Sequence, residues 1–197
     1  MGQIGNININ NDTMTMRSSK SIFCESFYFI DVYDENNVKK FIKSTERLIR
    51  KSREYNNYIM QLRTNVNALN YDSIMSNIAL ADTDLELHHY PLTLYDIVET
   101  VMNYHIIKQD NITSFSIAKE VMDCHFQNII GLVSLCETNH ELAHLSSIFI
   151  NKKQIFGNYE EFLKRYETGL TVDCKEKIKK LNEYSDNNVA IDFKGIL

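Results

Sequence analysis

The stretch GLVSLCETNHELAH, residues 131–144, decides the fold, because its pattern changes from strand to helix within a few positions. Residues 131–136 are a short apolar run of strand length. Thr138, with Glu141 three residues later, matches a capping box, so we expect a helix to begin at about residue 139. His140 and His144 share one face of that helix at the spacing that lets two imidazoles bind one metal ion.

A second histidine pair closes the upstream segment Leu85-Glu86-Leu87-His88-His89, which we expect to form a strand that Pro91 ends. Consecutive strand residues point to opposite faces of a sheet, so His88 and His89 cannot easily do the same work. One of them can join His140 and His144 at a metal ion while its neighbour faces elsewhere, for instance a water molecule. The spacing therefore predicts a three-histidine metal site with one further histidine beside it. The alternative is a set of ordinary surface histidines.

Working outward, apolar periodicity predicts a mainly helical chain. We expect one long helix or two consecutive ones over residues 36–69, and an aromatic, β-branched strand or strand pair over residues 22–33. Further helices are expected from Thr93, over residues 114–126, from Asn158 and over residues 173–184. The prediction is an α+β fold with one globular domain over residues 21–184. Polar tails over residues 1–20 and 185–197 flank it.

Composition narrows the class of protein. The chain has 197 residues, a net charge of −5, one proline and six glycines, which argues against collagen-like, disordered and uniformly basic chains. No apolar run approaches the roughly 18 residues of a membrane-spanning helix, and no secretory signal is evident, so we expect a cytoplasmic protein. The usage of Asn, Ile and Lys agrees with an AT-rich genome such as that of a virus. Scattered cysteines predict reduced, buried thiols: Cys24, Cys124, Cys136 and Cys174.

The order of a strand ending in His-His, a second strand and a helix carrying HxxxH resembles the HNH, or ββα-metal, nuclease finger of small phage-encoded proteins. The resemblance places a finger at about residues 85–150 and implies a metal-dependent DNA endonuclease or nickase with one divalent ion, Mg²⁺, Mn²⁺ or Zn²⁺. It implies His89 as the general base and three metal ligands: His88, His140 and His144.

The chain departs from that family at one informative position. The family usually has an asparagine at the start of the second strand, where it orients the base histidine, but Gly131 stands at that spacing. The nearest asparagine is Asn128, and Glu141 is a second candidate for an orienting group. The departure motivates an alternative, a finger that keeps its fold and metal but binds DNA or a protein partner without cleavage.

Residues 140–144 also spell HExxH, the zinc-peptidase signature, in which Glu141 would be the general base. That motif belongs in the middle of a long helix, whereas here it is expected at a helix start. His105 and His125 lie on the apolar sides of their helices, and we expect them to be partly buried with local hydrogen-bond partners.

A basic stripe indicates where DNA could lie. Between Val38 and Glu54 there are seven basic residues and two acidic ones, a local charge of +5. Such a stripe can follow phosphates with salt-dependent, largely sequence-independent affinity, although a solvated helix face gives the same pattern. The residues expected to contact nucleic acid are Lys39, Lys43, Arg47, Arg50 and Arg53.

Overall fold

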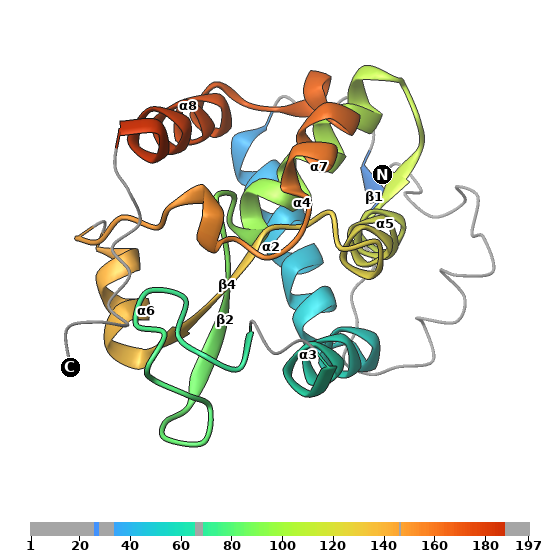
Figure 1. The fold of residues 1–197 in the computed structure, drawn as a ribbon. Coiled ribbons are helices and arrows are strands. Elements are labelled where there is room, and N and C mark those ends of the chain that lie inside the picture. Colours follow the sequence, from blue (N-terminus) through green and yellow to red (C-terminus); the bar gives the residue numbers. More distant parts are fainter. Residues whose placement is uncertain (1–25, 28–33, 66–68, 146, 188–197) are drawn as a thin grey trace.

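The computed structural model describes residues 26–27, 34–65, 69–145 and 147–187 (Figure 1). This part of the chain contains seven α-helices and two separate two-stranded antiparallel sheets, β1 with β3 and β2 with β4, which confirms the α+β, mainly helical prediction. The elements in chain order are β1 (Ser26–Phe27), α2 (Glu35–Lys51), α3 (Arg53–Asn65), β2 (Leu85–His89), α4 (Leu94–Ile107), β3 (Ile112–Thr113), α5 (Ser114–Phe126), β4 (Leu132–Cys136), α6 (Glu137–His144), α7 (Tyr159–Arg165) and α8 (Val172–Asn187). Two 3-10 turns, η3 (Lys152–Gln154) and η4 (Glu167–Gly169), flank α7.

Two consecutive helices, α2 and α3, occupy the region predicted to hold one long helix or two. The break falls at Ser52, which takes an extended conformation and donates its backbone N–H to the carbonyl of Ile49. Its hydroxyl then accepts the backbone N–H of Tyr55 at 3.1 Å, so one residue ends α2 and caps α3.

The main core lies where α2, α4 and α5 pack together. Apolar residues three and four positions apart face inward from each helix, as the periodicity predicts. Thr93 and Thr113 cap α4 and α5 with reciprocal side-chain and backbone hydrogen bonds, so both helices begin where their capping residues require. Helix α5 reaches strand β2 through His125, whose Nε2 atom lies 3.0 Å from Nε2 of His89.

Strands β2 and β4 lie side by side in Figure 1, with His88 opposite Val133 and His89 opposite Leu132. Val133 and Leu135 pack with Ile150, whereas Leu132 belongs to a cluster with Tyr58, Leu62 and Leu69. Residues paired across antiparallel strands share a face, so His88 and His89 point to opposite faces, as predicted.

Helix α6 begins at Glu137, so the prediction of a start at residue 139 capped by Thr138 is wrong. Cys136 is the N-cap residue and its side chain makes no capping bond. The cap comes instead from Asp72, a buried carboxylate in the loop before β2. Asp72 accepts the Cys136 backbone N–H at 2.6 Å and the Asn139 side-chain amide at 3.0 Å. A carboxylate at a helix N-terminus satisfies free N–H groups and complements the helix dipole.

One predicted boundary differs from the structure, and several predicted segments lie wholly or partly outside the described residues. Helix α8 continues to Asn187, past the predicted start of a tail at Ser185, because the Ser185 hydroxyl accepts the Lys152 backbone N–H at 3.0 Å. Of the predicted strand at residues 22–33, the described part is β1, and the tails over residues 1–20 and 188–197 lie outside the described ranges. Within the described ranges no helix combines the length and apolar character needed to span a membrane.

Candidate metal centre

Three imidazoles converge between β2 and α6. The Nε2 atom of His140 lies 3.2 Å from Nδ1 of His88 and 3.1 Å from Nε2 of His144. The three nitrogen atoms lie within 4.8 Å of one another, close enough to share a single ion. The structure therefore brings together the three residues that the sequence assigned as metal ligands.

Glu86 stands behind this group of histidines. It lies two residues before His88 on β2, and so on the same face of the strand, and its Oε2 atom lies 2.8 Å from Nδ1 of His140. A Nδ1–H that donates to this carboxylate leaves the Nε2 lone pair of His140 directed at the other two imidazoles. Carboxylates commonly fix metal-binding histidines in this way.

The centre is partly open to solvent. The His140 side chain is 24% exposed and His144 is exposed at the end of α6, so a water molecule or an anion can reach the site. Burial lowers the pKa of His88 to about 4, with the charges of His140, His144 and Arg50 as further causes. A neutral imidazole is the form that binds metal, and three imidazoles suit Zn²⁺ better than Mg²⁺, which prefers oxygen ligands.

His89 occupies a different environment on the other face of β2. It is 5% exposed, its ring stacks on Tyr55 with centroids 6.3 Å apart, and its Nε2 atom lies 3.0 Å from Nε2 of His125. Nδ1 of His125 in turn lies 2.7 Å from the carbonyl oxygen of Val121. Burial lowers the pKa of both imidazoles, to about 4 in His125, so both are neutral near pH 7.

Among the contacts of the described residues, none joins Asn128 or Glu141, the two candidate orienting residues, to His89. Asn128 has a positive φ of 53° just after α5, and its side-chain oxygen accepts a hydrogen bond from the Tyr58 hydroxyl at 3.3 Å. Glu141 is exposed on α6. The polar group that lies within hydrogen-bond distance of His89 is His125, which the sequence suggested as a partly buried histidine with local partners.

The comparisons with known proteins place the chain in a family. A family model described as "Bacteriophage G278-like virion protein" matches residues 2–194. The chain belongs to this virion protein family. The match confirms the expectation of a phage protein. The matched family is not a nuclease family. The resemblance of this chain to HNH nucleases therefore rests on its local motifs. No curated protein and no solved structure matches the chain.

The predicted basic stripe follows α2, but its members differ in their contacts. Lys39 pairs with Glu35 at 3.2 Å and Arg50 with Glu46 at 3.8 Å. Arg53 is the first residue of α3, and within the described ranges neither it nor Arg47 forms an ion pair. Lys43 is exposed on α2. Arg50 connects the stripe with the histidines, because its charge contributes to the lowered pKa of both His88 and His89.

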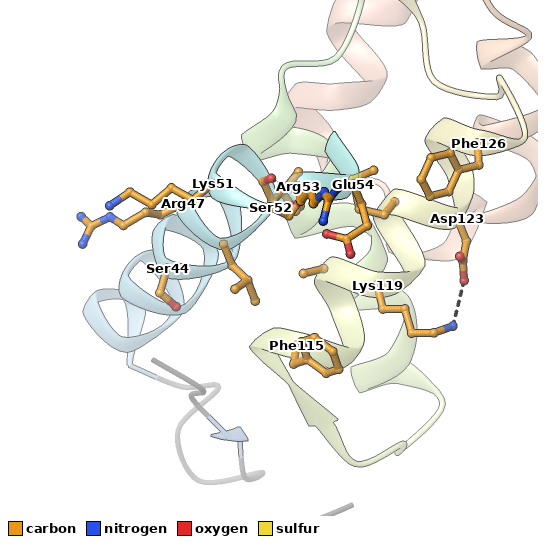
Figure 2. Close-up of a pocket in the computed structure, with 14 residues that line it drawn as sticks. Ser44, Arg47, Lys51, Ser52, Arg53, Glu54, Phe115, Lys119, Asp123 and Phe126 are labelled. Atoms are coloured by element: carbon orange, nitrogen blue, oxygen red, sulfur yellow. Dashed lines mark hydrogen bonds and ion pairs between the residues drawn. The ribbon is translucent and has the colours of Figure 1, made fainter. Parts of the chain in front are cut away.

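Arg47 and Arg53 also border a cavity of about 550 Å³ between α2, the start of α3 and α5. Figure 2 shows the Arg47 side chain extending away from α5, beside Lys51, whereas Arg53 and Glu54 lie over the opening. Phe115 and Phe126 stand at its two ends. Two residues of the basic stripe, Arg47 and Arg53, therefore lie at the rim of this mainly apolar cavity.

His105 and the cysteines stand outside the group formed by His88, His140 and His144. His105 lies between two carboxylates, 2.7 Å from Asp110 and 2.6 Å from Glu120, which confirms the expected local partners. The three cysteines in the described ranges are buried and free, as predicted, and Cys24 lies outside those ranges.

Three functional or supporting residues were missed at the sequence level. Glu86 could have been found, because strand alternation puts it on the His88 face. Asp72 and His125 gave no such signal, since neither lies on the strand or helix that carries the paired histidines.

Replacing Glu86 by Ala is expected to weaken Zn²⁺ binding by about 10- to 100-fold, because the His140 imidazole loses the carboxylate that directs Nε2 into the site. Competition with a chromophoric chelator measures the affinity. Glu137→Ala is the matched control, since that carboxylate is exposed on the same helix. Equal losses in the two variants would contradict the positioning role of Glu86.

Without metal, the free energy of unfolding is expected to fall as the pH drops from 6.5 towards 4. The unfolded chain binds a proton at His125 below about pH 6.5, whereas the folded chain resists it down to a pKa of about 4. This difference is worth up to about 3 kcal/mol and is fully present only above pH 6.5. Urea unfolding in a chelator, repeated with His125→Gln, measures it. An unchanged pH slope in the variant would contradict the prediction.

Proposed function

We propose that this virion-family protein is a metal-dependent DNA endonuclease or nickase built on a ββα-metal finger formed by β2, β4 and α6. The observation that carries the proposal is the convergence of His88, His140 and His144, which come from a strand and a helix that are 52 residues apart. Three imidazoles around a solvent-accessible position are the ligand set of a catalytic metal site. A single Zn²⁺ or Mn²⁺ ion is the proposed cofactor.

The bound ion would stabilise negative charge on the scissile phosphate and on the leaving oxygen. His89 would take a proton from water as the water oxygen bonds to phosphorus. The bond from phosphorus to the leaving sugar oxygen breaks, and that oxygen takes a proton from solvent. Near pH 7 His89 is neutral, so it has a free lone pair that can accept a proton from water.

DNA is the proposed substrate because the basic stripe of α2 includes Arg50 near its C-terminal end. The charge of Arg50 contributes to the lowered pKa of His88, so the stripe extends towards the candidate metal centre. A backbone-following stripe of this kind gives salt-dependent affinity. The family description supports a place in the phage particle, and this replaces the expectation of a cytoplasmic location in the host cell. Contacts with other virion proteins are part of this proposal.

A second candidate is a metal-binding finger that holds DNA or a protein partner without cutting. The specific observation in its favour is the burial of His89, which is 5% exposed and faces away from the three metal-binding imidazoles. The zinc-peptidase alternative has less support, because α6 ends at His144 and the nearest third imidazole is the upstream His88.

The test is plasmid nicking by the full chain, stripped of metal and reloaded with Zn²⁺, Mn²⁺ or Mg²⁺. We expect nicking that requires His88, and a loss of about 10²- to 10⁴-fold in His89→Ala, the usual contribution of a general base. His105→Ala is the control, because that side chain bonds to Asp110 and Glu120 elsewhere. Metal and DNA binding without nicking would favour the second candidate, and undiminished nicking by His89→Ala would reject the mechanism.

A further inference from the structure

His89 and His125 form a buried pair that is joined by a single hydrogen bond. The two Nε2 atoms are 3.0 Å apart, and His125 is fully buried in α5. Tyr55 and Tyr58 meet the His125 ring edge-on, with centroids 5.6 Å and 5.5 Å away. Both imidazole rings are therefore packed against tyrosine rings inside the protein.

The hydrogen bonds fix where each proton resides. A carbonyl oxygen can only accept, so the 2.7 Å contact between Val121 and His125 requires a proton on Nδ1 of His125. Neutral His125 then has a lone pair on Nε2, which must accept from its partner. The proton of neutral His89 therefore lies on Nε2, and its free lone pair lies on Nδ1.

We propose that His125 is the positioning residue for His89, selecting the tautomer in which Nδ1 is the basic atom. This inference rests on the proposed function for its catalytic meaning. His125 would do from α5 what the nuclease family does with an asparagine on the second strand, where this chain has Gly131. The neighbouring face of β2 stays free for the metal ligands. Because the wrong tautomer of a catalytic histidine can cost orders of magnitude in rate, this selection has a measurable effect.

The first measurement is a long-range ¹H–¹⁵N spectrum of the histidine rings in the full, metal-free chain at pH 7. We expect a protonated nitrogen at Nε2 and an unprotonated one at Nδ1 of His89, and the reverse in His125. In His125→Leu the acceptor is gone and His89 should become a mixture of tautomers. His125→Gln keeps an acceptor oxygen and should restore the Nε2–H form at least in part.

Tyr58→Phe is the matched control, because it removes the hydroxyl that bonds Asn128 while leaving the ring that packs on His125. It should change neither the tautomer nor the nicking rate. In His125→Leu we expect nicking to slow by about 10²-fold at unchanged DNA affinity, with partial recovery in His125→Gln. Thermal melting of each variant shows that it is folded at the assay temperature.

The outcomes separate the inference from the function on which it rests. A Nδ1–H tautomer of His89 in the unmodified chain, or an unchanged nicking rate in folded His125→Leu, would overturn the inference. If the unmodified chain does not nick DNA but shows the expected tautomer and its loss in His125→Leu, the positioning by His125 is supported and the nuclease is rejected.

Discussion

Replacing His140 by Ala is expected to lower the affinity for Zn²⁺ by at least about 10²-fold, more than the loss of a supporting carboxylate would. His140 is the central member of the site, because its Nε2 atom is the one that lies close to both His88 and His144. Its removal leaves two ligands on different elements. Isothermal titration and the Zn²⁺-dependent rise in melting temperature both report the change, since a ligand at 100 times its Kd adds about 2.7 kcal/mol of stability.

The metal-free variant should remain folded. The His140 side chain is partly exposed and belongs to none of the buried apolar clusters of the described residues, so the core loses little packing. His105→Ala serves as a matched control, because it removes an imidazole that lies between Asp110 and Glu120 and leaves the three proposed metal ligands in place. Zn²⁺ binding by His140→Ala with the affinity of the unmodified chain would show that the three imidazoles do not form a metal site.

Much of the fold could be predicted because local signals agreed with each other. Thr93 and Thr113 carry capping patterns at the starts of strongly periodic helices, and the structure begins α4 and α5 there. Strand alternation separated His88 from His89, and the i, i+4 spacing put His140 and His144 on one face. These are rules about neighbours in the chain, so a single sequence suffices to apply them.

The errors arose where distant residues override local patterns. Thr138 matches a capping box, yet α6 begins earlier because Asp72, 64 residues before Cys136, supplies the capping carboxylate. Asn128 was a candidate to orient His89 by its place in the chain, but the side chain that lies within hydrogen-bond distance of His89 is that of His125, which tertiary packing brings there. No periodicity or motif reports such contacts, since they depend on how whole elements pack.

Gly131→Asn is expected to lower the free energy of unfolding by about 3 kcal/mol or more, which is at or above the upper end of the usual cost of overpacking a core. The substitution would restore the asparagine of the nuclease family. A Cβ atom at residue 131 would lie 2.1 Å from the backbone oxygen of Tyr90. The Tyr90 backbone N–H also bonds to the Gly131 carbonyl at 3.0 Å, so the two backbones are held together. A clash with backbone cannot be relieved by a rotamer change, and glycine is required for this close approach.

Urea unfolding of Gly131→Asn, Gly131→Ala and the exposed control Thr138→Asn measures this cost. Both glycine variants should be destabilised, because the clash begins at Cβ, and the control should be close to neutral. Stability equal to that of the unmodified chain in Gly131→Ala would contradict the close approach of residue 131 to the Tyr90 backbone. If the prediction holds, residue 131 cannot carry an orienting side chain unless the backbone moves, so the orientation of His89 that we propose would come from another element. His125 is the residue in contact with His89 that meets this need.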